Sequence, residues 1–400
     1  MTDIPIASSV QDVPPSRIRE LADIAFSMEG VLKLYFGESN LPTPQYIKDA
    51  AAKALKEGYT FYTENAGLPS LRSAIARKYQ ELHQVELDPA SEIVVTASGV
   101  QALNVGIRCT LNPGDEALVL TPAWPNGASI VRLFSALPRQ IPLLLKDKKY
   151  EIDFEQLEGA TTSRTKLLVY TSPSNPLGWV ASSQDQARLL EFCRRHRLWL
   201  LADEVYERIY YEGNVAPSIL RLCARDDAVM VVQSFSKSYS MTGWRLGWLV
   251  ARRDLAQKAT QLNEFIVSHA PAMAQKAGET ALRDGEPDIR EMIGRLRDQR
   301  DFCIRAFSSM RRVTLPKPEG AFYLFPRIEG LTDSFGFCHL LLLEKRVGLA
   351  PGVAFGAGGE GSVRICYAAD RSVLEPAMER LAAFLENWSS TETKVKARPR

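Results

Sequence analysis

The stretch that decides how the chain is interpreted is residues 234–245, Ser234-Phe235-Ser236-Lys237-Ser238-Tyr239-Ser240-Met241-Thr242-Gly243-Trp244-Arg245. Apolar runs at 228–232 and 246–250 flank it and predict two buried strands. Lys237 is therefore expected among hydroxyl groups at the end of a strand. An amine in a partly desolvated pocket has a lowered pKa and becomes a nucleophile toward aldehydes.

The hydroxyl groups and the arginine of the same stretch suit a phosphate dianion. A lysine that forms an imine, next to groups that hold a phosphate, is the combination that pyridoxal 5'-phosphate requires. The plain alternative is a polar strand-to-loop junction with a solvated lysine. The rest of the chain decides between the two interpretations.

Composition excludes several classes of protein. The 400 residues can bury a large core and suggest two or three domains. The formal net charge is only +2 with both signs interspersed, so we expect no nucleic-acid partner and no membrane partner. Six scattered cysteines without a CxxC pair indicate reduced thiols in a cytoplasmic protein, and four unclustered histidines predict no metal site.

The order of the apolar segments predicts an α/β fold. From residue 92 strands alternate with helices, which indicates a large domain with a mostly parallel central sheet covered by helices. Strands and helices near both ends of the chain predict a second, smaller α+β domain built from both termini. The expected units are an N-terminal segment of the small domain at 1–44, the large domain at 45–285, the rest of the small domain at 286–388, and a disordered tail at 389–400.

Several expected elements near the domain limits can be compared with a structure. Short strands are expected at 32–36, 141–145 and 320–325. One long helix is expected at 255–282, followed by another at 287–310.

Chemically distinctive residues follow the expected strands of the large domain. They are Gly99, Trp124, Asn175, Asp203 and Lys237. Open α/β sheets bind ligands at the carboxyl ends of their strands, so these residues are expected to meet at one edge. This convergence carries more weight than any single motif.

Each of these residues also has a purely structural interpretation. A carboxylate at the end of an apolar strand is costly unless paired, so Asp203 is expected to have a cationic partner, but it could instead cap a helix. The indole of Trp124 could fill the core or stack on a flat cofactor. Arg364 could bind a carboxylate or simply face solvent, and Gly37 could mark only a turn.

With these motifs in order, the chain resembles the fold-type I, class I/II aminotransferases, the aspartate aminotransferase family, over nearly its whole length. The resemblance implies pyridoxal 5'-phosphate and three catalytic residues, Lys237, Asp203 and Tyr206. It further implies a set of cofactor-binding residues, namely Ser98, Gly99, Val100, Trp124, Asn175, Asp203, Tyr206, Ser234, Lys237 and Arg245, with Tyr62 reaching the cofactor of a neighbouring subunit. The implied substrate-binding residues are Gly37, Trp124, Asn175 and Arg364.

The same resemblance implies a homodimer with active sites at the interface, and an amino group transferred from an L-amino acid to a 2-oxo acid by a ping-pong mechanism through an aldimine of Lys237. Two alternatives stay open. One is a lyase of the same fold, a C–S lyase or an enzyme like aminocyclopropane-carboxylate synthase, which shares the cofactor residues. The other is a non-catalytic regulatory module, although no helix-turn-helix is visible.

Two positions depart from the family pattern. The usual Asn-Pro-Thr-Gly appears as Asn175-Pro176-Leu177-Gly178, which leaves the asparagine in place. Val100 offers the phosphate no side-chain hydrogen bond, so the backbone must serve there. The sequence shows no convincing second arginine for a side-chain carboxylate, which argues against strict dicarboxylate specificity.

Overall fold

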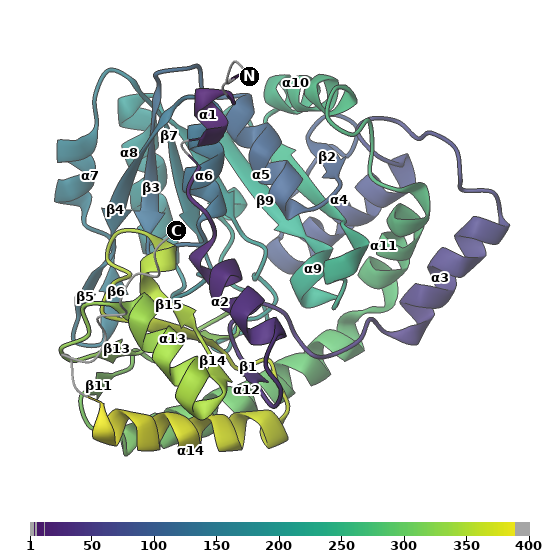
Figure 1. The fold of residues 1–400 in the computed structure, drawn as a ribbon. Coiled ribbons are helices and arrows are strands. Elements are labelled where there is room, and N and C mark those ends of the chain that lie inside the picture. Colours follow the sequence, from purple (N-terminus) through teal and green to yellow (C-terminus); the bar gives the residue numbers. More distant parts are fainter. Residues whose placement is uncertain (1–3, 5, 12, 389–400) are drawn as a thin grey trace.

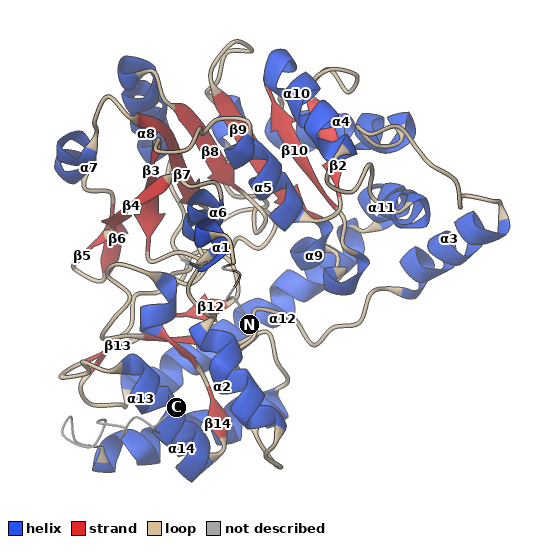
Figure 2. Cartoon of the chain, turned by 45° about the horizontal axis from the view of Figure 1, so that its top comes forward, coloured by secondary structure: helices blue, strands red, loops and turns tan. Residues whose placement is uncertain are grey.

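A seven-stranded sheet forms the centre of the protein (Figures 1 and 2). The structure is a computed structural model and describes residues 4, 6–11 and 13–388. The strand order is β2-β10-β9-β8-β7-β3-β4, and only β10 runs antiparallel to its neighbours. The bounds are β2 Ile93–Thr96, β3 Glu116–Thr121, β4 Leu137–Pro142, β7 Thr165–Thr171, β8 Trp199–Asp203, β9 Val229–Ser234 and β10 Gly247–Ala251. The expected mostly parallel sheet is confirmed.

Helices cover both faces of this sheet (Figure 1). One face carries α4 (Pro69–His83), α8 (Ser183–His196) and α11 (Ala272–Asp284). The other carries α5 (Gly99–Arg108), α6 (Asn126–Leu133) and α10 (Arg253–Glu264). Because both faces are covered, the central strands β8, β9 and β10 are buried along almost their whole length.

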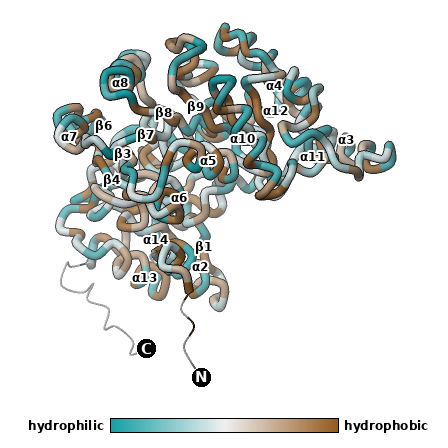
Figure 3. Tube along the Cα trace, turned by 90° about the horizontal axis from the view of Figure 1, so that it is seen from above, coloured by the Kyte–Doolittle hydropathy of each residue, from teal (hydrophilic) through white to brown (hydrophobic). Residues whose placement is uncertain are grey.

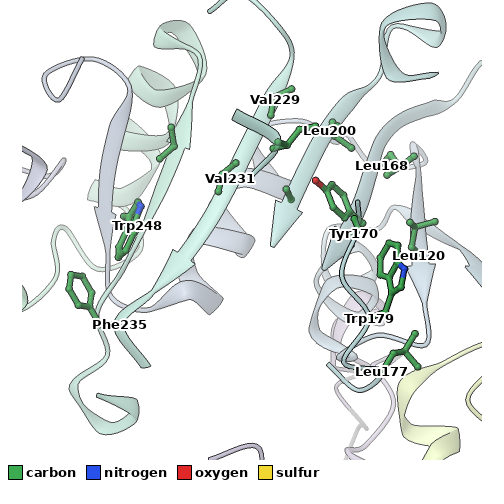
Figure 4. Close-up of a cluster of buried hydrophobic side chains, with 14 of the residues drawn as sticks. Leu120, Leu168, Tyr170, Leu177, Trp179, Leu200, Val229, Val231, Phe235 and Trp248 are labelled. Atoms are coloured by element: carbon green, nitrogen blue, oxygen red, sulfur yellow. The ribbon is translucent and has the colours of Figure 1, made fainter. Parts of the chain in front are cut away.

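Alternate residues of each strand enter different cores. Leu200 packs in the core under α8, whereas Leu201 packs in the core under α5. Figure 4 shows the first of these cores, where Leu168, Leu200 and Val231 lie along neighbouring strands and Trp248 packs against Phe235. In Figure 3, α8 lies at the periphery and is coloured largely as hydrophilic.

A smaller α+β unit is assembled from segments near both ends of the chain, as expected (lower part of Figure 1). Its core joins Leu21 and Leu34 to Phe322, Phe337 and Trp388. Its elements are α2 Arg17–Phe26, β1 Leu32–Lys33, α12 Glu286–Ser308, β11 Val313–Thr314, β12 Tyr323–Leu324, β13 Arg327–Ile328, α13 Ser334–Lys345, β14 Val347–Gly348, β15 Ala350–Pro351, β16 Val363–Cys366 and α14 Arg371–Asn387.

The remaining elements lie around these two units. They are α1 Ser8–Gln11, α3 Gln45–Lys56, β5 Leu144–Lys146, β6 Lys149–Glu151, α7 Phe154–Ala160 and α9 Phe235–Ser238. The division of the chain at residues 44 and 285 stays a prediction, and the tail expected at 389–400 lies outside the described residues. No helix in the described part of the chain is both long and apolar enough to cross a membrane.

The structure corrects four of the expected elements. The helix expected at 255–282 is two helices, α10 and α11, because the chain breaks at residues 265–271 and Pro271 starts the second helix. The strand expected at 141–145 is divided between β4 and β5. The strands expected at 32–36 and 320–325 shrink to two residues each, and Tyr35 and Phe36, which follow the first of them, leave the sheet to line the cavity described next.

Candidate functional site

A cavity of about 780 Å³ lies at the edge of the sheet where the parallel strands end. It lies between the sheet and the smaller unit and contains most of the residues singled out from the sequence. Those that line it are Gly37, Gly99, Val100, Trp124, Asn175, Asp203, Tyr206, Ser234, Lys237, Arg245 and Arg364. Of the predicted site residues, only Ser98 and Tyr62 are outside this lining.

Lys237 lies in the short helix α9, directly after β9. Its Nζ donates a hydrogen bond to the carbonyl oxygen of Gly37 at 2.7 Å. Burial lowers the pKa of this amine to about 8. A larger fraction of Lys237 is therefore an uncharged nucleophile near neutral pH than for an ordinary lysine.

Asp203 is the last residue of β8 and is buried. Its Oδ1 accepts a hydrogen bond from the Val205 amide at 3.4 Å, and no described side chain forms an ion pair with it. Burial raises the pKa of Asp203 to about 7, while the charge of Lys237 opposes that shift. The cationic partner expected from the sequence is thus not a protein side chain, and a ligand with a protonated nitrogen would fill that role.

The turn from β2 into α5 forms one wall of the cavity. Ser98 is its N-cap, with its hydroxyl accepting from the Gln101 amide, and it has a left-handed backbone with φ of 113°. A Cβ on Gly99 would lie 3.1 Å from the Cβ of Ser234, so the glycine lets β9 approach the helix start closely. The amides of Gly99 and Val100 belong to the first turn of a ten-residue helix, where donors and dipole favour an anion.

Hydroxyl and guanidinium groups complete this wall. The Ser234 hydroxyl lies 2.9 Å from that of Ser236. Arg245 follows in a left-handed conformation, and its Nη1 donates to the carbonyl oxygen of Thr242 at 2.6 Å. Together with the helix start, these groups form a cradle for a phosphate dianion.

A buried guanidinium stands on the opposite side, in the smaller unit. Arg364 is only 2% exposed, and its Nη1 donates to Asn175 Oδ1 at 2.9 Å. Its Nη2 donates to the carbonyl oxygen of Tyr35, and its Nε has no partner among the described residues. A buried guanidinium with a free donor suits a carboxylate ligand.

A tyrosine that sequence reasoning missed joins these two sides. The hydroxyl of Tyr323 lies 2.7 Å from that of Tyr206, and Tyr206 lies 3.5 Å from Asn175 Nδ2. A Cβ at position 37 would come within 2.3 Å of the Tyr323 hydroxyl, so only glycine fits at Gly37. The one available signal was the aromatic pair in the expected strand 320–325. Residues 13–19 also line the cavity, and nothing in their sequence indicated it.

Tyr62 is the predicted residue that lies apart. Its side chain is 89% exposed, and its ring meets that of His269 edge-on at 5.7 Å. It therefore does not take part in the cavity of its own chain.

The donor set fits pyridoxal 5'-phosphate. A cradle of amides and hydroxyls suits the phosphate, a buried carboxylate without a cation suits the ring nitrogen, and Lys237 suits the aldehyde. Trp124 lines the same cavity and offers a flat face. Among the described residues, no group of three or more His, Cys, Asp or Glu side chains could hold a metal ion.

Comparison with known proteins agrees with this geometry. The family model "Aminotransferase class I and II" matches residues 29–381. The chain belongs to this family. Members of the family depend on pyridoxal phosphate, so the protein is a pyridoxal-phosphate-dependent aminotransferase.

Individual relatives align with nearly the whole of this chain. An aspartate aminotransferase of Pyrococcus abyssi is 38% identical over 95% of this chain and 98% of its own. An aromatic-amino-acid aminotransferase of Thermococcus litoralis is 34% identical with the same coverage. The crystal structure of an aromatic aminotransferase from Pyrococcus horikoshii superposes with a TM-score of 0.86 at 35% identity, covering 92% of this chain and 98% of that one. The lyase alternative is not favoured by these comparisons.

Proposed function

We propose that the aminotransferase transfers an amino group from an L-amino acid to a 2-oxo acid in two half-reactions, with Lys237 as the residue that binds the cofactor covalently. The observation that carries this proposal is the meeting of a buried amine with a lowered pKa, an unpaired buried carboxylate and a buried arginine with a free Nε donor in one cavity. When bound, pyridoxal phosphate supplies an electron sink for the pair released at the substrate Cα.

The protein's own groups have separable tasks in this scheme. Arg364 binds the α-carboxylate through its planar fork, and Asn175 holds that fork in place at 2.9 Å. Asp203 would keep the ring nitrogen of the bound cofactor protonated. The amine of Lys237, once free, would take the proton from the substrate Cα and return it to the cofactor at the former aldehyde carbon. Because the first 2-oxo acid would leave before the second one binds, ping-pong kinetics should result.

The cofactor itself would be held by groups from several elements. Gly99, Val100, Ser234 and Arg245 line the cavity and would bind the phosphate, and Ser98 fixes the turn as the N-cap of α5. Trp124 would offer its flat face to the ring, and Asn175 and Tyr206, whose polar atoms lie 3.5 Å apart, would bind its phenolic oxygen.

We further propose a homodimer, supported by an exposed apolar surface. The loops after α3 and α10 expose Phe61, Tyr62, Phe265, Ile266 and Val267, here called the Phe61 patch. The two loops are tied together by hydrogen bonds from Asn263 to Asn65 O at 2.9 Å and from Asn65 to Glu264 at 2.6 Å. An apolar surface of this kind marks an interface, and a second copy would let Tyr62 reach the partner's cofactor.

The names of the relatives support a class of substrate, and the state of the cysteines supports a cellular compartment. Relatives named for aspartate and for aromatic amino acids support an acidic or aromatic donor. All six cysteines are unpaired, which supports a reducing, cytoplasmic location.

The direct test is the Lys237→Ala variant. We expect it to lose amino transfer by at least about a thousandfold, because it removes both the covalent link and the base. Turnover is measured with an amino acid donor and 2-oxoglutarate, and ammonia release is assayed in parallel. A variant with full turnover would contradict the proposal, and oxo-acid-independent ammonia release by the unmodified protein would favour the lyase.

A further inference from the structure

The turn from β2 into α5 contains a residue with a strained backbone. Ser98 has φ of 113° and ψ of 160°, a conformation that essentially only glycine adopts without strain. The amides of Gly99 and Val100 follow it directly, so the direction in which they point depends on this conformation. Because strained residues persist only where surrounding contacts hold them, the contacts around Ser98 decide how well the turn is prepared for an anion.

The side chain of Gln101 makes two of these contacts possible. Its Oε1 accepts a hydrogen bond from the Ala97 amide, and its backbone amide donates to the Ser98 hydroxyl at 3.3 Å. The Gln101 side chain thus holds the backbone immediately before the strained residue. Gln101 is not one of the residues that line the cavity, so its side chain can act on a bound phosphate only through the turn.

Asn263 of α10 holds the other end of the Gln101 side chain and is fully buried. Its Oδ1 accepts from Gln101 Nε2 at 2.5 Å. Its Nδ2 donates to the carbonyl oxygens of Asn65 at 2.9 Å and Ser268 at 3.2 Å, in the two loops that carry the Phe61 patch. The Asn263 side chain therefore connects those two loops to the turn at Ser98.

The two carbonyl oxygens fix the direction of this series of hydrogen bonds. A carbonyl oxygen can only accept, so the N–H groups of Asn263 must face Asn65 and Ser268, and its oxygen is left for Gln101. Gln101 must then turn its N–H group toward Asn263 and its oxygen toward the Ala97 amide. With the Asn263 amide reversed, oxygen would face oxygen at one end and N–H would face N–H at the other.

We propose that Asn263 is a positioning residue for the cofactor phosphate, acting through Gln101 on the strained turn at Ser98. This inference rests on the proposed function, because it takes that turn as the phosphate site. The two side-chain amides do not touch the phosphate. They hold the backbone amides of Gly99 and Val100 in their binding direction before the anion arrives, which reduces the entropy lost on binding.

Gln275 provides a matched control. It is a fully buried amide in α11, and its Nε2 donates to the carbonyl oxygen of Ala270 at 2.8 Å and to the Thr63 hydroxyl at 3.3 Å. It thus fastens the same two loops as Asn263. Among the described residues its hydrogen-bond partners do not include any residue of the turn at 96–101. Truncating Gln275 therefore disturbs the loops without acting on the turn.

The test measures how much the phosphate group adds to cofactor binding. The dissociation constants of pyridoxal 5'-phosphate and of pyridoxal are measured by calorimetry on the full chain after removal of the cofactor. Their ratio cancels what the two ligands share at Lys237 and Asp203. We expect Asn263→Ala to lower the advantage of the phosphorylated ligand about 10-fold, the effect of losing one hydrogen bond, and Gln275→Ala to leave it unchanged. An unchanged ratio in Asn263→Ala, or an equal loss in both variants, would overturn the proposal.

A second variant tests the connection from its other end and decides the question if Asn263→Ala does not fold. Gln101→Met keeps the length of the side chain but removes its hydrogen bonds to Ala97 and Asn263. It should lower the same ratio about 10-fold. The double variant should lose no more than either single variant, because the two residues form one connection. Losses that multiply would show that the residues act independently, which contradicts the proposal.

This inference and the proposed function fail in different ways. If the unmodified protein transfers no amino group from any donor, the proposed function fails, whatever the affinity ratio is. If it transfers amino groups and prefers the phosphorylated ligand, but Asn263→Ala and Gln101→Met keep the whole preference, the proposed function stands and the role of Asn263 is wrong.

Discussion

The reactivity of the site begins with single residues whose surroundings oppose their usual charge. Burial favours the uncharged form of both Lys237 and Asp203: it lowers the pKa of the lysine and raises the pKa of the aspartate. Near pH 8 about half of Lys237 is the uncharged, nucleophilic amine. Asp203 has no cationic side chain beside it, and the ring nitrogen of the cofactor would supply that positive charge. Pairs of groups whose pKa values are shifted in this way are typical of functional sites.

The lowered pKa of Lys237 predicts how the cofactor-free protein captures pyridoxal phosphate. Only the uncharged amine attacks the aldehyde, and burial lowers its pKa to about 8. The rate of capture should therefore rise with pH and level off above about 8. Absorbance after rapid mixing measures this rate, with Lys237→Ala as the control that should form no visible band. A rate that continues to rise toward the ordinary lysine pKa near 10.5 would contradict the assignment.

At the scale of elements, a buried clamp fixes the segment that carries two site residues. Glu207 follows Asp203 and Tyr206 and is buried against α4, where it pairs with Lys78 and with His83 Nε2 at 2.9 Å. All three side chains of this clamp are buried. The helix thereby holds the end of β8 and the loop after it from behind the sheet.

Breaking this clamp should destabilise the fold. Glu207→Gln leaves Lys78 buried without its counter-charge, and loss of one partner of a buried pair costs about 3–5 kcal/mol. Urea unfolding of the cofactor-free protein measures the change in the free energy of unfolding. The control is Glu57→Gln, which removes an exposed pair with Lys53 and should cost no more than about 1 kcal/mol. Equal stability of the two variants would show that the clamp does not hold the fold.

At the scale of the whole molecule, the site lies between the large sheet and the smaller unit. We propose that a second copy of the chain also contributes to it. The sheet supplies Lys237 and Asp203, whereas the smaller unit supplies Arg364 and Tyr323. The Phe61 patch lies on a different surface, formed by the loops after α3 and α10.

Dimerisation can be tested on that patch. Phe265 is 86% exposed in the single chain, so Phe265→Asp costs a monomer little but buries a charge in a dimer. We expect light scattering to show the variant near the chain mass of 44.6 kDa and the unmodified protein near twice that value. The variant should also bind the cofactor more weakly, because Tyr62 no longer reaches it. Leu343→Asp, at another exposed apolar position, is the control, and an unaltered mass of Phe265→Asp would exclude this interface.

Sequence reasoning succeeded where one rule of topology applied. Gly99, Asn175, Asp203 and Lys237 follow strands that end at the same edge of the sheet, so their strand-end positions predicted that they meet. Tyr323 was missed because its place depends on how the smaller unit packs on the sheet, which no local pattern encodes. The break near Pro271 was missed because the apolar period continues across it.

The measurement that tests the central claim most directly is the absorbance spectrum of the purified protein before and after addition of single amino acids. The account predicts a visible band that disappears in favour of a near-ultraviolet band with certain donors, while each donor is converted to its 2-oxo acid in a single stoichiometric turnover. A visible band that persists with every amino acid, or no visible band after pyridoxal phosphate is added, would contradict the account.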